Sequence, residues 1–341
     1  MRSRFSRGTS YAAALALGMA FAELRAHVPS ELTHSTGHAM NALASADAAH
    51  TARGTRAAHE TSDVQLAERP LPSLRYPHGR IIEGASPQRV ILFSFDDGPD
   101  RRTTPLLLDR LDAVGVKAVF FLTASRIVGR SPAEREQAAL AREIVARGHI
   151  VGSHTVDHLQ LPLLGDVSAL AQIAGAEQIF QRVLGFRPTL IRPPGGARSP
   201  RIDALLAERG YTTVLWNLGA GDFQVKTAGE VLDTFRRVLE RRERENGEHG
   251  GIVLLHDTYA WSVDAFQLIY AELRARNCEL LNSGEELYDI VSDLTLFHEP
   301  RAGALPGVSA APAQLPRAAF EARQAVLRQE TAQRCSSTDG Y

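Results

Sequence analysis

Short apolar runs alternate with longer helical patterns along most of this chain, and this alternation constrains the fold more than any other feature. It begins near residue 86. The predicted strands are 90–95, 117–122, 149–153, 189–191, 211–216, 251–255 and a weak one near 278–281. The predicted helices are 104–114, 132–147, 166–184, 200–209, 227–243, 262–276 and 284–292. Because repeated strand-then-helix units build parallel sheets covered by helices, we predict an α/β domain.

Residues that could carry chemistry follow these predicted strands closely. In a barrel, the loops after all strands converge on one face, whereas an open sheet gathers only the loops near its switch point. We therefore predict a distorted (β/α)7-type barrel of parallel strands, with an open doubly wound sheet as the alternative. The residues concerned are Asp96, Asp97, His154, Arg192, Asp222 and His256.

The N-terminus has the pattern of a secretory signal peptide, which we place at residues 1–22. Three arginines precede an apolar stretch, residues 11–22, which ends in the small-x-small pattern Ala20-Phe21-Ala22. The stretch is too short to span a bilayer comfortably. We expect an exported protein, located in the periplasm, the cell envelope or outside the cell. The alternative is an uncleaved amphipathic segment.

The rest of the chain divides into three predicted parts. Residues 23–85 are rich in Ala, His, Ser, Thr and Arg, and we expect a low-complexity linker or extension without a core of its own. Residues 86–297 form the predicted catalytic domain. Residues 298–341 are an Ala/Pro-rich tail, with one expected helix at 317–333 and no catalytic feature.

Composition excludes some partners. The formal net charge is −1, so no global field attracts nucleic acid, and we expect no nucleic-acid partner. We also expect no transmembrane segment beyond the N-terminal stretch. The two cysteines, Cys278 and Cys335, are far apart and form no metal or redox motif. We therefore predict no disulfide framework, and cysteine usage does not indicate the compartment.

Two adjacent carboxylates, Asp96 and Asp97, end the first predicted strand, before Gly98-Pro99. Neighbouring buried carboxylates repel each other unless a cation neutralises one of them or chemistry uses the pair. Downstream, His154 and His158 place two imidazoles at i and i+4. One carboxylate with two histidines is a usual ligand set for a catalytic divalent metal, and the second carboxylate is then free to act as a base. The pattern indicates a metal-assisted hydrolase.

Together these motifs resemble those of the polysaccharide deacetylase family (NodB-homology domain, carbohydrate esterase family 4), over roughly residues 88–293. The first, second, third and fifth motifs of the family occur in order. The fourth motif, normally Asp-x-x-Asp-Trp, is degraded. The four motifs are Ser94-Phe95-Asp96-Asp97-Gly98-Pro99, His154-Thr155-Val156-Asp157-His158, Arg192-Pro193-Pro194-Gly195-Gly196, in which Gly195 stands where the family has an aromatic residue, and Leu254-Leu255-His256; the degraded one is Gly219-Ala220-Gly221-Asp222-Phe223.

The resemblance implies a metal site and a base. Asp97, His154 and His158 would hold a divalent metal, zinc first, with cobalt or nickel as alternatives. Asp96 would be the general base, which removes a proton from the metal-bound water. Arg192 would orient Asp96 and keep it ionised.

The resemblance also implies an acid and a substrate pocket. His256 would protonate the departing nitrogen, and Asp222 would raise the pKa of His256. The backbone N–H of Gly195 would stabilise the oxyanion. Leu254 would line a pocket for the acetyl methyl group, and Trp216 (or Trp261) could supply a face for sugar stacking.

The expected function is that of a hydrolase acting on carbon–nitrogen bonds other than peptide bonds. It would remove N-acetyl groups from a glucosamine-containing polysaccharide, either peptidoglycan or a chitin-like oligosaccharide. Three departures from the family pattern put the substrate in doubt more than the reaction: Gly195 replaces an aromatic residue, Gly219 replaces the first Asp of the Asp-x-x-Asp-Trp motif, and Phe223 replaces its Trp. The alternatives are an O-acetyl (xylan-type) esterase and a catalytically silent glycan-binding module.

Overall fold

The computed structural model describes residues 80–297 and 317–336. The predicted signal segment, nearly all of the predicted linker and the remainder of the tail lie outside the described residues. Among the helices in the described ranges, none is both long enough and apolar enough to cross a membrane.

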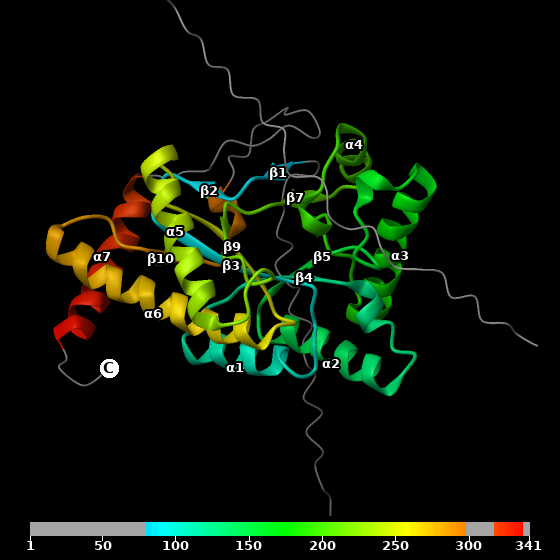
Figure 1. Ribbon diagram of the computed structural model, residues 1–341, viewed down its shortest axis with the longest axis horizontal. Helices are drawn as coiled ribbons and strands as arrows, with labels where there is room; N and C mark the ends of the chain where they lie inside the picture. Colours follow the sequence, from blue (N-terminus) through cyan, green and yellow to red (C-terminus); the bar gives the residue numbers. More distant parts are fainter. Residues whose placement is uncertain (1–79, 298–316, 337–341) are drawn as a thin grey trace, which may run out of the picture. The chain divides into compact units, whose positions relative to one another are not determined.

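A single sheet of mostly parallel strands forms the centre of the described domain (Figure 1). The neighbour order is β1-β7-β6-β5-β4-β3-β9-β2, with β10 paired to β3 and β8 paired to β9. Only the β2–β9 pair is antiparallel among the described strands. The strands are β1 (Ile81–Ile82), β2 (Ala85–Ser86), β3 (Val90–Asp96), β4 (Val119–Leu122), β5 (Ile150–Ser153), β6 (Leu190–Ile191), β7 (Thr212–Val214), β8 (Leu218–Gly219), β9 (Gly250–His256) and β10 (Asp289–Ile290).

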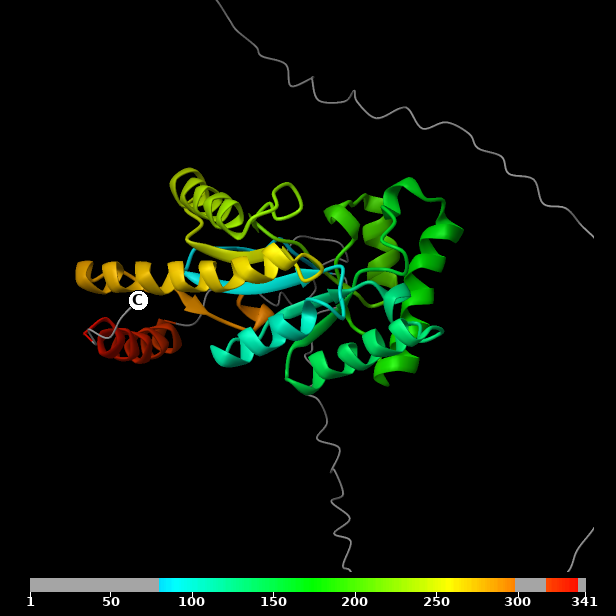
Figure 2. The same cartoon turned by 60° about the horizontal axis from the view of Figure 1, so that its bottom comes forward.

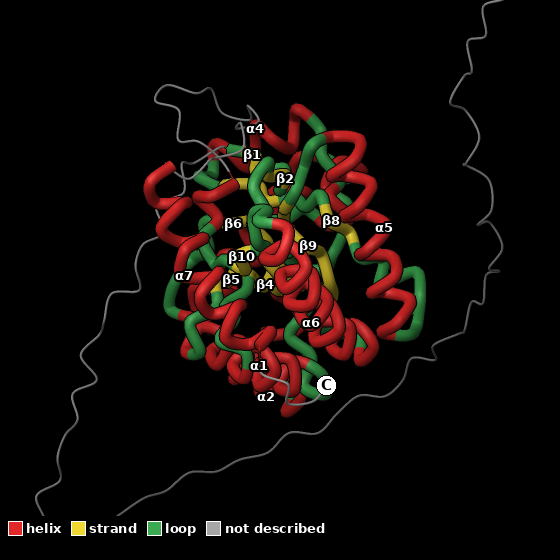
Figure 3. The backbone as a smooth tube through the Cα atoms, turned by 90° about the vertical axis from the view of Figure 1, so that its left-hand side faces the viewer, coloured by secondary structure: helices red, strands yellow, loops and turns green. Residues whose placement is uncertain are grey.

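Helices surround the strands, as Figure 3 shows with strands in yellow and helices in red. The helices are α1 (Thr104–Ala113), α2 (Pro132–Ala146), α3 (Asp166–Leu184), α4 (Pro200–Glu208), α5 (Ala228–Asn246), α6 (Ala260–Ser283) and α7 (Arg317–Ser336). The starts of α2 and α4 follow local sequence signals. Ser131 and Glu134 form a capping box before α2, and Ser199 caps α4. The predicted α/β class with a mostly parallel sheet is confirmed.

The segment 81–86 connects the two ends of the sheet. The carbonyl of Ile82 accepts a hydrogen bond from the N–H of Leu215, just after β7, at 2.8 Å. Two residues later, the carbonyl of Gly84 accepts from the N–H of Ile252 in β9 at 3.0 Å. Gly84 has φ 91°, and a Cβ there would lie 3.0 Å from the Cα of Trp216. Residues 81–85, at the end of the predicted linker, therefore belong to the sheet and close the barrel.

The apolar core has one layer inside the barrel and one beneath the helices. Because side chains alternate along a strand, β3 sends Leu92 into the barrel interior and Phe93 toward the helices. Phe121 of β4 also lies in the interior cluster. The outer layer is dominated by contacts such as Phe93 against Phe266 of α6, whose ring centroids are 5.0 Å apart. Strands buried on both faces explain the continuous apolar runs in the sequence.

Two predicted elements near the C-terminal end of the barrel are wrong. Residues 278–281, predicted as a weak strand, lie inside α6, because a short apolar run does not distinguish a strand from a buried helix. Residues 284–292, predicted as a helix, contain β10 instead. The N–H of Asp289 donates to the carbonyl of Arg89, directly before β3, at 2.8 Å. Pairing with a distant strand overrides the local helical pattern.

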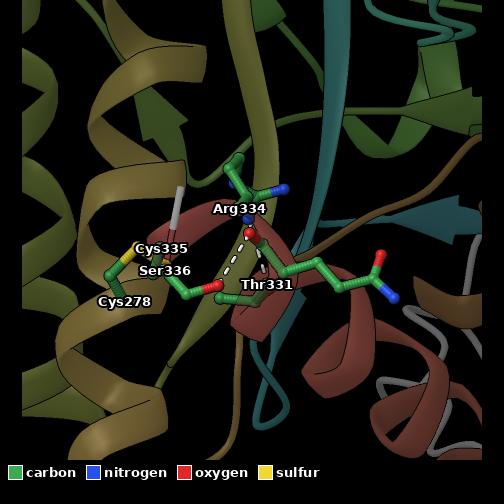
Figure 4. The surroundings of a disulfide bond; sticks show 6 residues. Cys278, Thr331, Arg334, Cys335 and Ser336 are labelled. Carbon is green, nitrogen blue, oxygen red and sulfur yellow. Dashed lines mark hydrogen bonds between the residues drawn. A yellow bond between two sulfur atoms is a disulfide. The ribbon is translucent and has the colours of Figure 1, made fainter. Parts of the chain in front are cut away.

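A disulfide joins Cys278 of α6 to Cys335 of α7, with Cα atoms 6.0 Å apart (Figure 4). The prediction that the two cysteines form no disulfide is wrong, because a separation of 57 residues gives no local sign of their proximity. The two helices lie side by side (Figures 1 and 2). The amide of Gln324 in α7 also binds the backbone N–H and carbonyl of Leu287, at 2.9 and 3.0 Å.

Candidate active site

Three potential metal ligands meet where β3 and β5 end. The Oδ1 atom of Asp97 lies 3.5 Å from Nε2 of His154 and 3.3 Å from Nε2 of His158. One ligand atom from each residue lies within 4.8 Å of the others. His154 is buried, whereas the His158 side chain is 46% exposed, so the group opens to solvent on one side.

The donor set fits a divalent cation. The buried Oδ1 atom of Asp97 has no hydrogen-bond partner among the described residues, although an isolated carboxylate oxygen is costly to bury. The Nδ1 atom of His154 lies 2.7 Å from the carbonyl oxygen of Arg192 and donates to it, which leaves the lone pair of Nε2 facing Asp97. Burial lowers the pKa of His154, and the neutral ring is the form that binds metals.

The backbone at these ligands is strained. Among the residues that the structure describes, three non-glycine residues have positive φ: Asp97 at 73°, Thr155 at 67° and His158 at 58°. Non-glycine residues in this region cost free energy and tend to gather at functional sites. The strain falls on two of the three potential ligands and on the residue directly after the third.

Asp96 lies beside this group and is held by Arg192. The Asp96 side chain is 4% exposed, and its Oδ1 atom accepts a hydrogen bond of 2.7 Å from Nη1 of Arg192. The guanidinium is fully buried, donates to the carbonyls of Val214 and Leu215, and lies 4.1 Å from the ring centre of Phe121. The other Asp96 oxygen, Oδ2, is 3.7 Å from Nε2 of His154. One carboxylate oxygen is thus fixed while the other faces the potential metal site.

His256 lies on the strand next to Asp96, in the same register row. Its Nδ1 atom is 2.9 Å from Oδ1 of Asp222, and its backbone N–H donates to Oδ2 of Asp222 at 2.7 Å. Burial alone would lower the pKa of His256. The hydrogen bond and charge of Asp222, with the charges of Asp96 and Asp97, outweigh burial and raise the pKa to about 9. The imidazole therefore holds a proton at neutral pH.

The three predicted substrate-binding residues lie on β9, in the turn after β6 and two residues after β7. Leu254 is 5% exposed and pairs in register with Ser94 of β3, two residues before His256. Gly195 is exposed in the turn after β6, with φ 63°. Trp216 is partly buried, and its ring centre lies 5.3 Å from the Arg192 guanidinium. A Cβ on Gly196 would lie 2.9 Å from the Trp216 ring, so the indole covers the turn that contains Gly195.

Sequence comparison identifies relatives of this chain. A family model described as polysaccharide deacetylase matches residues 83–214. A peptidoglycan-N-acetylglucosamine deacetylase of Bacillus cereus is 30% identical over 203 residues, which are 59% of this chain and 89% of that protein. This chain belongs to the polysaccharide deacetylase family.

Two further members of the polysaccharide deacetylase family are similar. The peptidoglycan-N-acetylmuramic acid deacetylase PdaC of Bacillus subtilis is 31% identical over 194 residues, which are 57% of this chain. Those residues are 38% of PdaC, so the chain spans about two fifths of the length of that relative. The structure of the chitin deacetylase from the fungal pathogen Colletotrichum lindemuthianum matches with a TM-score of 0.50 and 26% identity. The match covers 59% of this chain and 88% of that one.

Sequence reasoning missed Ser262, which lies in the first turn of α6. Its hydroxyl donates to Oδ2 of Asp222 at 2.6 Å and accepts from the N–H of His256 at 3.2 Å. It therefore fixes the carboxylate that contacts His256. Ser262 is outside the polysaccharide deacetylase motifs, and no local pattern distinguishes it from any other serine at a helix start.

Asp257 was also missed as a site neighbour, although it follows His256 directly. The carboxylate is fully buried and accepts a hydrogen bond of 2.6 Å from the Thr104 hydroxyl, while Oδ1 has no partner among the described residues. Burial raises the pKa of Asp257 to about 7, and the charge of Asp97 adds to this effect. A Cβ on Gly98 would lie 2.1 Å from Oδ2 of Asp257. Asp257 therefore packs directly against the turn that follows Asp97.

Proposed function

We propose that this chain is a metal-dependent hydrolase that removes N-acetyl groups from a glucosamine-containing polysaccharide, either peptidoglycan or a chitin-like oligosaccharide. The observation that carries the proposal is the position of Asp96. It is held by Arg192 at 2.7 Å, lies beside the Asp97, His154 and His158 group, and is in register with His256 on the next strand. The names of the relatives support the reaction type.

Asp97, His154 and His158 would hold the divalent cation, with zinc as the first choice and cobalt or nickel as alternatives. When bound, such a cation supplies Lewis acidity toward a carbonyl oxygen and lowers the pKa of a water. The hydrogen bond from Nδ1 of His154 to the carbonyl of Arg192 fixes the ring orientation for this task.

Asp96 would act as the general base through Oδ2, because Oδ1 is engaged by Arg192. Arg192 would keep the carboxylate oriented. The guanidinium is itself held in place by hydrogen bonds that it donates to two backbone carbonyls. This arrangement limits the reorganisation needed when Asp96 takes a proton. General-base assistance is typically worth about 10²- to 10⁴-fold in rate.

His256 would act as the general acid. Its Nδ1 atom is engaged by Asp222, so the proton on Nε2 is the one available to a leaving nitrogen. The raised pKa, about 9, favours the protonated ring at neutral pH. The acid and base thus lie on adjacent strands, as needed to act on one bound amide.

Three other residues would contact the substrate. The N–H of Gly195, in its exposed turn, would donate to the oxyanion, and one such donor is worth about 3 kcal/mol. Leu254 would line the acetyl pocket. Trp216 would form part of the wall above Gly196.

Export to the periplasm, the cell envelope or the exterior is part of the proposal. The Cys278–Cys335 disulfide supports it, because disulfides persist in oxidising compartments and are rare in the cytosol.

The experiment is an acetate-release assay on N-acetylglucosamine oligomers and on purified peptidoglycan. We expect activity that a chelator abolishes and that added zinc or cobalt restores. Asp97→Ala and His154→Ala should each lose metal binding and at least a hundredfold in kcat/KM. Asp233→Ala, a 67% exposed aspartate on α5, should match the unmodified protein in both.

Undiminished hydrolysis in the metal-stripped protein would contradict the proposal. Release of acetate from acetylated xylan, with none from N-acetylated oligomers, would indicate the esterase alternative. Tight oligosaccharide binding without any acetate release, in the presence of zinc, would indicate the silent binding module.

A further inference from the structure

A row of aromatic rings extends from His256 toward solvent. The imidazole is flanked by Phe223, at 6.0 Å between ring centroids, and by Tyr259, at 5.7 Å. Tyr259 in turn stacks on Trp261 at 4.9 Å, with only 6° between the ring planes. Phe223 is 58% exposed, whereas Tyr259 and Trp261 are partly exposed. Two large rings therefore flank the proposed general acid, and a third, Trp261, lies beyond Tyr259.

The row is fixed to the catalytic centre by a hydrogen bond. The indole N–H of Trp261 donates to the backbone carbonyl of Asp222 at 2.8 Å, and the carboxylate of Asp222 binds His256. Tyr259 directly precedes α6, and Trp261 lies in its first turn. Trp261 is thus carried by a long helix, and Tyr259 lies at the residue that precedes it. Rigid aromatic side chains of this kind give contact area at low entropic cost.

A cation lies at the outer end of the row. The Lys226 ammonium is 6.0 Å from the ring centre of Trp261, on an exposed side chain with no ion pair in the described part of the chain. Two other cations on loops of this barrel, Arg126 and Arg198, are neutralised by Asp100 and Asp203, respectively. Lys226 differs from them because its charge remains available to a ligand.

We propose that Lys226, Tyr259 and Trp261 form a subsite for a carboxylate-bearing sugar next to the sugar that loses its acetyl group. This inference rests on the proposed function and narrows its substrate. Aromatic rings accept the apolar face of a pyranose, and an unpaired ammonium selects a carboxylate within reach. The preferred substrate is therefore an acetylated glycan with acidic substituents, such as a lactyl ether or a uronic acid. A neutral chitin-like polymer would lack the partner for Lys226.

The test compares oligomers that differ in one group. Acetate release is measured on alternating N-acetylglucosamine–N-acetylmuramic acid oligomers, on the same oligomers with the lactyl carboxyl reduced to an alcohol, and on chitin oligomers of equal length. A fourth substrate, an N-acetylated oligomer containing glucuronic acid, distinguishes a lactyl from a uronic source of the carboxylate. We expect the unmodified protein to have the lowest KM on a carboxylate-bearing oligomer, and this KM should rise with salt.

The variants isolate the charge of Lys226. Lys226→Met should raise KM about two- to fivefold on the carboxylate-bearing oligomers, with kcat unchanged, because exposed ion pairs are of modest strength. It should leave KM on the reduced oligomers unchanged, and Lys226→Glu should have the same selectivity with a larger effect. Tyr259→Leu should raise KM on every oligomer. The matched control is Lys117→Met, since Lys117 pairs with Asp112 outside the site, and it should change nothing.

Equal effects of Lys226→Met on the carboxylate-bearing and the reduced oligomers would overturn the subsite. So would the absence of any effect on either. If the unmodified protein releases acetate from none of the substrates, the proposed function fails instead. Calorimetry then tests the subsite independently. It measures the binding of the carboxylate-bearing and the reduced oligomers to the unmodified protein and to Lys226→Met.

Discussion

Asp222 has more influence on the chemistry of this site than its degraded motif suggests. Its Oδ1 atom is hydrogen-bonded to the imidazole of His256. Its Oδ2 atom accepts hydrogen bonds from the backbone N–H of His256 and from the hydroxyl of Ser262. This contact is a main reason that the pKa of His256 lies near 9 despite burial. The sequence retains the second aspartate of the motif, while the first aspartate and the Trp are replaced by Gly219 and Phe223.

Replacing Asp222 by Asn should therefore move the alkaline limb of activity. As the proposed general acid, His256 would work only while protonated, so activity should be present below its pKa, near 9, and should be lost as the pH rises through it. Without the charge of Asp222, burial dominates and the pKa of His256 falls, so the limb moves to lower pH. Consider a pH above the pKa of His256 in both the unmodified protein and Asp222→Asn. For each unit by which the variant lowers this pKa, about tenfold fewer His256 rings are protonated, and kcat/KM should fall by the same factor. The measurement is the pH dependence of kcat/KM.

The control is Asp166→Asn, an 81% exposed aspartate at the start of α3. Its profile should coincide with that of the unmodified protein. An unchanged alkaline limb in Asp222→Asn would show that His256 does not donate the proton.

Gly98 is a second residue whose replacement has a predictable effect, because there is no space for a side chain at this position. The residue follows Asp97, and a methyl group there would overlap the Asp257 carboxylate, with 2.1 Å between the new Cβ and Oδ2. The two segments cannot separate easily, because the Thr103 and Thr104 hydroxyls also bind Asp257. Glycine is thus required at position 98 because the buried side chain of Asp257, which is distant in the sequence, occupies the space where a Cβ would lie.

Gly98→Ala should destabilise the fold by roughly 1–3 kcal/mol and weaken metal binding by displacing Asp97. Denaturant unfolding and metal titration measure the two effects. Gly229→Ala, in α5 with no heavy atom within 4 Å of the new Cβ, should be neutral or slightly stabilising. The double variant Gly98→Ala/Asp257→Ala should recover part of the stability, and a loss equal to the sum of both single variants would contradict the overlap.

Among the elements, the two-residue strand β1 contributes more than its length suggests. Ile82 is fully buried in the barrel interior, and its carbonyl accepts a hydrogen bond from the N–H of Leu215, just after β7. Two residues on, Gly84 binds β9. Without this segment, the backbone groups at both sheet ends would be left without partners.

Ile82→Ala should lower the free energy of unfolding by about 2–5 kcal/mol, because it leaves a cavity inside the barrel. The neighbouring Glu83 is exposed, so Glu83→Ala should change stability by no more than about 0.5 kcal/mol. Urea unfolding of both variants makes the comparison. A similar small effect at both positions would mean that the segment does not close the barrel.

For the whole molecule, the disulfide is one of several contacts that hold the C-terminal helix against the barrel. α7 contacts the barrel through Gln324, which binds the backbone of Leu287, through Arg323, which binds Asp289, and through Cys335. The bridge closes a loop with a sequence separation of 57 residues. A loop of this length corresponds to about 4 kcal/mol in the chain-entropy description.

Reduction should therefore lower the melting temperature and destabilise α7 first. The double variant Cys278→Ser/Cys335→Ser should show the lower stability from the start and should not respond to reductant. Thermal unfolding with and without reductant, for both proteins, measures this effect. Equal melting temperatures for the oxidised and reduced unmodified protein would contradict it.

The sequence alone determined the class of fold and the identity of the chemical groups. Six of the seven predicted strands and most helices follow from hydrophobic periodicity and caps, which depend on neighbours a few residues apart. The adjacent aspartates and paired histidines indicated a set of metal ligands, because the ability to bind a metal is a property of the residue types. The structure brings Asp97, His154 and His158 together.

Only the tertiary structure decided how distant segments meet. The closure by residues 81–86, the Cys278–Cys335 bond and the packing of Asp257 against Gly98 join residues separated by tens to hundreds of positions. Such contacts depend on packing of the whole barrel, since no local pattern encodes which partner a buried group will find. For the same reason, the residue types around 284–292 favour a helix, while pairing with β3 makes part of that segment a strand.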